Sequence, residues 1–195
     1  MATPERLRTL RAVLERRQED LQVVLDNLHD SHNASAVLRT CDGFGVGTVH
    51  LLSTDNPLPE ISKGVSGYTR KWLEMPSYKS TRACVSVLKA EGLRIVATHV
   101  DDSARSYLEI DWTAPVALVL GNEHRGCTEE MLAEADERVK VPMQGMAQSF
   151  NVSVSAGILL GEAYRQRMAA GRYEVSWSEG KERLYQQWLE RDEVG

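Results

Sequence analysis

Three polar segments of the chain combine residue types and spacings that could do chemistry. They are HDSHN at 29–33, GNEHRG at 121–126 and VPMQGMAQSFN at 141–151. The third contains Pro142 and Gly145, has no helical or strand periodicity, and runs directly into an apolar segment. Such a loop must either satisfy its own backbone groups or offer them to a ligand.

The methionines of this third segment favour an aromatic ligand. The thioethers of Met143 and Met146 can make soft contacts to adenine or to another aromatic ring. The alternative is that both methionines belong to the hydrophobic core, and the residue types alone leave the two interpretations open.

The second segment follows an apolar run that is typical of a buried strand. Gly121 and Gly126 allow close approach of the backbone, and Asn122 and Glu123 can hydrogen-bond a ribose or an amine. The alternative is a turn between a strand and a helix that is capped by Thr128. The residues by themselves do not decide between these two.

The first segment places His32, Asn33 and Arg39 near the N-terminus of one predicted helix. These side chains could contact a ligand at the end of the preceding strand. In the alternative, Asn33 caps the helix and Arg39 pairs with Asp42 at the i,i+3 spacing. The glycines of GFGVG at 43–47 end this helix and precede a strand, which excludes a dinucleotide-binding loop.

The composition bounds the class of protein. The chain has 195 residues, 42% of them hydrophobic and 26% charged, which is typical of one globular domain with additional end helices. No apolar run approaches the roughly 18 residues of a membrane span, and the N-terminus lacks a signal-peptide pattern, so we expect a cytoplasmic protein. The three cysteines and five histidines have no disulfide or metal-site spacing, so we expect no metal.

The arginines are unevenly distributed in a chain of net charge -5. Residues 1–17 hold five arginines against two glutamates, and 165–172 holds three arginines and no acid. Such local basic patches can follow a phosphate backbone even on an acidic protein, although a solvated helix face is the alternative.

The elements that must position these segments alternate between strands and helices. We predict strands over 21–28, 48–53, 71–76, 93–100, 114–121 and 138–143. We predict helices over 33–45, 80–92, 128–135, 151–171 and 178–193, an amphipathic helix in 1–17, and a longer connection over 54–70. This alternation predicts an α/β fold with a mostly parallel sheet and helices on both faces. All three polar segments then follow strand ends, where such sheets bind ligands.

Taken together, three ordered stretches resemble the SPOUT superfamily of RNA 2'-O-ribose methyltransferases. They are HNASAVLRTCDGFGV, LVLGNEHRG and VPMQGMAQSFNVSVSAGILL. Within that superfamily they look like the TrmH-type enzymes, which methylate a guanosine ribose in the D-loop of tRNA with S-adenosylmethionine. The resemblance covers essentially the whole chain and implies a C-terminal trefoil knot, a homodimer and tRNA as partner. It divides the chain into a basic helix (1–17), a methyltransferase domain (18–172) and a C-terminal helical extension (173–195).

The resemblance also assigns candidate site residues. Arg39 stands at the catalytic centre, Asn33 would orient the ribose or Arg39, and Glu123 would support them, while Ser149 and Asn151 would position the nucleotide. The residues matched to the cofactor site are Thr98, Gly121, Val141, Met146 and Phe150. The residues expected to contact RNA are Arg6, Arg8, Arg11, Arg16, Arg17, His32, Arg165, Arg167 and Arg172.

Two rival functions remain open at this point. One is the same chemistry on ribosomal RNA, and the other is a non-catalytic RNA-binding relative. Relatives often carry Lys-Pro where this chain has Asp30 and Ser31, so an acid replaces a positive charge beside the catalytic segment.

Overall fold

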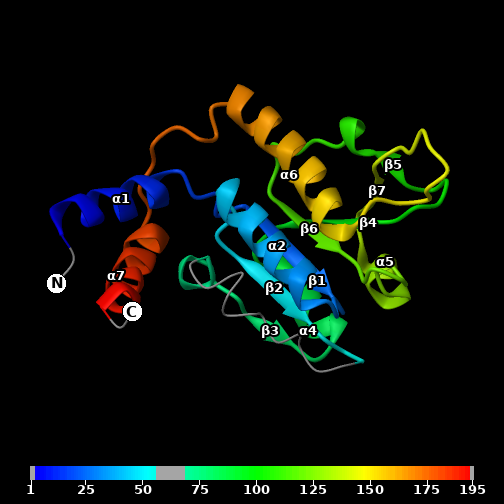
Figure 1. Ribbon diagram of the computed structural model, residues 1–195, viewed down its shortest axis with the longest axis horizontal. Helices are drawn as coiled ribbons and strands as arrows, with labels where there is room; N and C mark the ends of the chain where they lie inside the picture. Colours follow the sequence, from blue (N-terminus) through cyan, green and yellow to red (C-terminus); the bar gives the residue numbers. More distant parts are fainter. Residues whose placement is uncertain (1–2, 56–68, 194–195) are drawn as a thin grey trace.

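A computed structural model describes residues 3–55 and 69–193 of the chain (Figure 1). Seven strands form one sheet in the order β3-β2-β1-β6-β4-β7-β5, and every pairing between them is parallel. Helices cover both faces, so the prediction of an α/β fold with a parallel sheet is confirmed. The trefoil knot that the resemblance implies stays a prediction.

The strands are β1 (Leu21–Asp26), β2 (Val49–Leu52), β3 (Ser77–Tyr78), β4 (Arg94–Thr98), β5 (Arg105–Ser106), β6 (Val116–Leu120) and β7 (Glu137–Lys140). The helices are α1 (Pro4–Glu15), α2 (Ser31–Gly43), α4 (Thr81–Ala90), α5 (Glu129–Glu134), α6 (Val152–Ala169) and α7 (Glu179–Glu193), with short 3-10 helices η1 (Arg70–Trp72) and η2 (Tyr107–Glu109). None of the helices in the described ranges is long and apolar enough to cross a bilayer.

The centre of the sheet is formed by β1 and β6, which are buried along their whole length. Successive side chains of a strand point to opposite faces. Val23 and Leu25 accordingly pack with α2 and α6, whereas Val24 packs with α4 and α5. Burial on both faces explains why these two strands read as continuous apolar runs.

The edges of the sheet differ from the prediction. A strand is predicted over 71–76, but this segment begins as η1, because Trp72 packs edge-on against Trp188 of α7 with ring centroids 5.1 Å apart. Pairing with the β2 segment begins only at Glu74 and continues through β3. No pattern in the sequence indicates β5 or η2, and most of the predicted connection over 54–70 lies outside the described residues.

The two ends of the chain pack against each other rather than on the sheet. In Figure 1, α1 and α7 lie together, far from α5. Leu10 and Leu14 of α1 form a small core with Trp188, and Arg6 pairs with Asp192 at 2.9 Å. The three cysteines are free and buried. The predicted domain boundaries at 17 and 172 stay predictions.

Candidate active site

One chain of hydrogen bonds joins the three polar segments. The Asn33 side-chain amide donates to Glu123 Oε1 at 3.1 Å, and the Asn151 amide donates to Asn33 Oδ1 at 3.0 Å. These three residues come from the start of α2, the loop after β6 and the N-cap of α6. Asn33 is separated from Glu123 by 90 positions in the chain and from Asn151 by 118 positions. The fold therefore brings these distant residues together where β1 and β6 end.

The N-terminus of α2 is capped by Asp30 and not by Asn33. The Asp30 carboxylate accepts hydrogen bonds from the backbone N–H groups of His32 and Asn33 at 2.7 and 2.9 Å. These bonds hold the pKa of Asp30 below its ordinary value, the bond from Asn33 being the larger cause. The alternative in which Asn33 caps the helix is therefore wrong, and the Asn33 side chain is left for the contact with Glu123.

Arg39 lies two turns further along α2, and its side chain is exposed. The alternative in which Arg39 pairs with Asp42 is wrong, because Asp42 forms an ion pair with the buried Arg17 instead. Within residues 3–55 and 69–193, Arg39 makes no ion pair or side-chain hydrogen bond. Its guanidinium is therefore available to an anion from outside the chain.

The loop after β6 folds back tightly on itself. Asn122 and Gly126 form an antiparallel bridge, and a Cβ atom at Gly121 would lie 2.1 Å from the backbone nitrogen of Cys127. Only glycine fits at position 121. The side chain of Thr98 at the end of β4 donates to Val119 O at 3.0 Å and accepts from Gly121 N at 3.4 Å. The predicted cofactor residues Thr98 and Gly121 are thus in direct contact.

Cys127 lies beside this contact, with its sulfur 3.6 Å from Thr98 Oγ1. Burial raises the pKa of this thiol to about 12, so Cys127 is a neutral side chain here. It lines the site without offering a nucleophile at ordinary pH.

The third segment forms an open loop between β7 and α6. In the described part of the chain, no hydrogen bond holds the main chain of residues 142–150, and Met146 is fully exposed. The core interpretation of Met146 is therefore wrong, and the loop has free backbone donors and acceptors. Val141 packs against the core at the start of the loop, while Phe150 is 39% exposed near its end.

These features fit a nucleoside cofactor. The predicted cofactor residues follow β4, β6 and β7, which are neighbours in the sheet, so their carboxyl ends share one edge. Backbone groups without protein partners can bind the edge of a base, and Met146 and Phe150 offer apolar contacts. Ser149 is exposed two residues before the α6 cap.

The structure divides the predicted RNA contacts into two groups. Six are exposed, and Arg6 is half-buried and paired with Asp192. Three of the exposed arginines also form ion pairs, Arg11 with Glu15, Arg165 with Glu162 and Arg172 with Asp20. The exposed members are Arg8, Arg11, Arg16, His32, Arg165 and Arg172. The prediction that Arg17 and Arg167 contact RNA is wrong, because both side chains are buried and hydrogen-bonded within the fold. Both arginines stabilise the structure instead.

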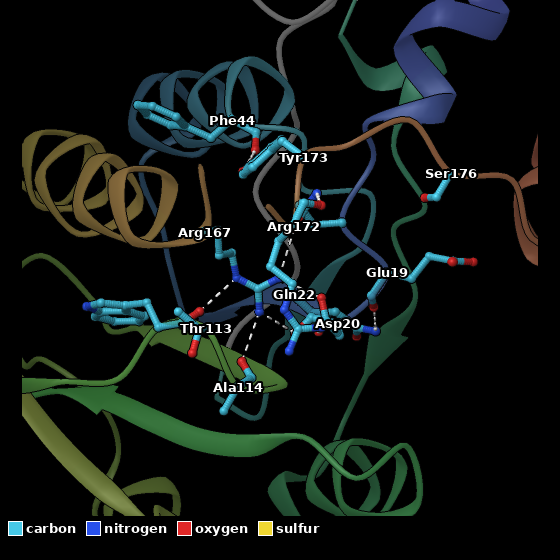
Figure 2. A network of polar contacts seen from close by, with 12 residues as sticks. Glu19, Asp20, Gln22, Phe44, Thr113, Ala114, Arg167, Arg172, Tyr173 and Ser176 are labelled. Carbon is cyan, nitrogen blue, oxygen red and sulfur yellow. Dashed lines mark hydrogen bonds and ion pairs between the residues drawn. The ribbon is translucent and has the colours of Figure 1, made fainter. Parts of the chain in front are cut away.

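Arg167 lies at the centre of one such network in Figure 2. Its guanidinium donates to Asp20 Oδ1 at 2.6 Å and to the carbonyl oxygens of Trp112 and Ala114 at 2.7 and 2.9 Å. Two further bonds reach Gln18 Oε1 and Asp20 O. Arg167 therefore fastens the end of α6 to the segments that enter β1 and β6.

Arg17 makes a second network of this kind at the end of α1. It donates to the carbonyl oxygen of Val46 at 2.8 Å, and its guanidinium lies over the Trp188 ring at 5.5 Å. Together with the ion pair to Asp42, these contacts leave Arg17 no exposed face for a phosphate.

Sequence reasoning missed two residues that shape the site, Asp26 and Asn27. The Asp26 carboxylate is fully buried and accepts from Thr128 N at 2.7 Å, which fastens the start of α5 to β1. Burial raises the pKa of Asp26 despite these bonds. Asn122, a candidate for ribose or amine binding, instead donates to Asn27 O at 2.9 Å. The available signal was a pair of polar residues where an apolar strand ends.

No cluster of three or more metal-ligating side chains occurs among the residues that the structure describes.

Comparison with known proteins gives consistent similarities. The model of the SpoU rRNA Methylase family matches residues 20–161. A tRNA (guanosine(18)-2'-O)-methyltransferase of Thermus thermophilus is 42% identical over 172 residues, covering 88% of each chain. The crystal structure of the A. aeolicus TrmH/SpoU tRNA modifying enzyme is similar with a TM-score of 0.90 at 38% identity, covering 96% of each chain. An AdoMet-bound rRNA methyltransferase from Sinorhizobium meliloti is similar with a TM-score of 0.69 at 28% identity, covering 80% of this chain and 59% of the other.

Proposed function

The chain belongs to the SpoU rRNA Methylase family, and from this premise we propose that it methylates the ribose 2'-oxygen of a guanosine in the D-loop of tRNA. The observation that carries the proposal is the hydrogen-bonded chain Glu123–Asn33–Asn151, which joins all three polar segments. The relative named as a tRNA (guanosine(18)-2'-O)-methyltransferase and the similar TrmH/SpoU tRNA modifying enzyme support tRNA over ribosomal RNA as the substrate.

The methyl donor in this proposal is S-adenosylmethionine, which supplies an electrophilic methyl group. The relative from S. meliloti whose structure is AdoMet-bound supports it, as do the free backbone groups of the 142–150 loop. Thr98, Gly121 and Val141 would form one wall of the site, with Met146 and Phe150 on the loop opposite. The proposal assigns no role to a metal.

Arg39 acts in the proposal as an electrostatic stabiliser. As the ribose 2'-oxygen bonds to the methyl carbon, the bond between the donor's sulfur and that carbon would break and the thioether product would leave. The 2'-OH proton would pass to solvent water, so negative charge develops on the oxygen during the transfer. An arginine has a pKa above about 12 and stays charged, so it is a poor general base but a strong partner for a phosphate or an alkoxide. The exposed guanidinium of Arg39, which has no partner in the described chain, suits this role.

Asn33, Glu123 and Asn151 position the reacting groups. Both ends of the Asn33 amide are engaged, because its nitrogen donates to Glu123 and its oxygen accepts from Asn151. The remaining N–H of that amide can hydrogen-bond the ribose or its phosphate. Ser149 lies on the same loop as the α6 cap and would hold the nucleotide from the other side.

The exposed arginines of α1 and α6 would bind the tRNA backbone. Phosphate contacts fix the position of an RNA without reading its bases. Arg8 and Arg16 lie on or just after α1, and Arg165 and Arg172 lie on or just after α6. His32, a further predicted contact, lies on the first turn of α2 and directly precedes Asn33.

A homodimer is part of the proposal. Val154 and Met168 of α6 are each 47% exposed, and Tyr164 between them is 39% exposed. A second copy of the chain could cover this apolar face. Sedimentation at micromolar concentration should give about twice the 21.8 kDa mass of one chain, and a fully active monomer would contradict the dimer. From the tRNA-modifying role we also infer that the protein is cytoplasmic.

Methyl mapping tests the function directly. Purified protein is incubated with labelled S-adenosylmethionine and with total tRNA or ribosomal RNA, and the label is mapped. Mass spectrometry of nuclease-digested tRNA from cells lacking the protein is the companion test. We expect D-loop 2'-O-methylguanosine to disappear. Its persistence, with loss of a ribosomal methyl group, would instead support the ribosomal alternative, and no transfer to either RNA would indicate a non-catalytic binding protein.

A further inference from the structure

A cavity of about 280 Å³ lies between the ends of β1 and β6, beside the hydrogen-bonded chain of the active site. Its buried lining includes Asn27, Asn122 and Cys127, and its exposed lining includes Asp55, Arg125 and Glu129. The volume falls just below the roughly 300–1,000 Å³ of pockets for drug-sized ligands, so it suits one small flat group.

The walls of the cavity are held by Asn27. This residue has a positive φ of 53°, which asparagine tolerates better than most residues. Its side-chain oxygen accepts from the backbone N–H groups of Thr54 and Asp55 at 2.9 and 3.3 Å, and its carbonyl accepts from Asn122. The ends of the neighbouring strands β2, β1 and β6 are thus fastened together around the cavity.

The cavity adjoins the active site through two parts of the chain. Asn122 lines it, and the next residue, Glu123, is hydrogen-bonded to Asn33. His29 also lines it and directly precedes Asp30, the cap of α2. A nucleoside whose ribose contacts Asn33 could therefore reach this cavity with its base.

Two charged side chains of the lining, Arg125 and Glu129, differ in sign and have no partner in the described part of the chain. Arg125 and Glu129 are exposed, and neither side chain makes an ion pair or hydrogen bond within the described ranges of the chain. Arginine binds the O6 and N7 acceptors of guanine in bidentate fashion, whereas adenine presents an amino group at the position of O6. A carboxylate accepts hydrogen bonds from the N1–H and N2 amino groups of guanine and repels bases that present only acceptors there.

We propose that this cavity recognises the guanine of the target nucleoside, with Arg125 bound to O6 and N7 and Glu129 bound to N1–H and the N2 amino group. The inference rests on the proposed function, because it assigns the base of the same substrate. A base outside a helical stack exposes all of these edges, as the bases of RNA loops do.

A base-substitution assay tests the proposal. Two tRNA transcripts are compared, one with guanosine and one with inosine at the target position, since inosine lacks only the N2 amino group. We expect the wild type to prefer guanosine by about tenfold in kcat/KM, the scale of a good base contact. Glu129→Gln should reduce this preference to about threefold or less, and Arg125→Met should lower kcat/KM on both transcripts.

Matched variants control for surface charge. Glu130→Gln changes the adjacent exposed residue of α5, and Arg82→Met removes an exposed arginine of α4, neither of which lines the cavity. Both should keep the tenfold preference. An unchanged preference in Glu129→Gln, or an equal loss in Glu130→Gln, would overturn the proposal.

A binding experiment separates this inference from the proposed function. Guanosine 5'-monophosphate and adenosine 5'-monophosphate are titrated into isotope-labelled protein, and the backbone amide signals of 126–129 are followed by NMR. Selective shifts with the guanine nucleotide, abolished in Glu129→Gln, would support the pocket even if no tRNA is methylated. Absence of selective shifts would overturn the pocket and leave the methyltransferase proposal standing.

Discussion

Substituting Arg167 with alanine should destabilise the fold. Arg167 is fully buried, and its five hydrogen bonds join α6 to the segments before β1 and β6. Breaking a buried ion pair by removing one partner costs about 3–5 kcal/mol, because the other partner loses its compensating charge.

The surroundings of Arg167 set the expected value within this range. The Asp20 side chain is 32% exposed, so its carboxylate can regain water when the guanidinium is gone. The carbonyl oxygens of Trp112 and Ala114 lose a charged donor as well, at about 1–3 kcal/mol for each group left unpaired. From these ranges we expect a loss of about 4 kcal/mol in the free energy of unfolding. For a chain of this size it corresponds to a Tm lower by roughly 8–16 °C.

Urea unfolding followed by circular dichroism, at one fixed protein concentration, measures this loss. The matched control is Arg165→Ala, because Arg165 is on the same helix and 68% exposed. Its partner Glu162 is only 8% exposed but keeps a hydrogen bond from Gln166 at 2.9 Å, so we expect a smaller loss than for Arg167→Ala. Arg167→Lys keeps the charge but loses the planar fork, and it should fall between the two. A loss for Arg167→Ala well below the roughly 3 kcal/mol of a broken buried pair, or equal losses for Arg165→Ala and Arg167→Ala, would refute the structural role.

The remaining predictions concern the surface and the site. Arg39→Ala should lower methyl transfer by about 10²–10³-fold, the scale of losing one electrostatic stabiliser, while calorimetry finds S-adenosylmethionine binding within a few-fold of the wild type. Arg39→Lys should also be poor, and near-normal turnover in Arg39→Ala would remove this residue from the mechanism. Reversing the charge of Arg8 and Arg16 should weaken tRNA binding. The slope of log K against log salt should become shallower by about 0.7–0.9 for each phosphate that the variant no longer neutralises. An unchanged slope would exclude α1 from the RNA surface. The pKa of Asp30 is lower in the folded chain than the ordinary 3.8, so its stabilising contribution is present above that value and disappears as the pH falls through the folded pKa. Asp30→Asn should remove this acid-side change in thermal stability between about pH 5 and 2, and an identical pH profile in the variant would contradict the assignment.

The parts of the site whose signals are local could be predicted from the sequence. Apolar strands followed by polar segments indicate where the sheet ends, and Asn33, Glu123 and Asn151 meet there. The cap of α2 was harder to predict, because Asp30 and Asn33 are both good capping residues and only the first turn of the helix distinguishes them. The two-residue strand β5 is too short to have a periodicity that could be recognised.

Whether an arginine side chain is buried or exposed depends on long-range contacts. Arg165 and Arg167 stand in the same basic stretch, yet one is exposed and the other is fully buried. The difference arises from Asp20 and Gln18, which are 147 and 149 positions away in the chain. Local charge density cannot reveal a partner at that separation, so a basic surplus was interpreted as surface.

The pairing of α1 with α7 has a consequence for the order in which the protein is completed during synthesis. Arg6 and Asp192 are partners separated by 186 positions, and Leu10 and Leu14 are covered by Trp188. A ribosome makes the N-terminus first, so α1 leaves the exit tunnel before α7 does. The apolar face of α1 therefore stays unpacked until α7 has also left the tunnel. The arginines of α1 therefore acquire their fixed arrangement late in synthesis, and under the proposed function a nascent chain that lacks α7 would not yet present them to tRNA.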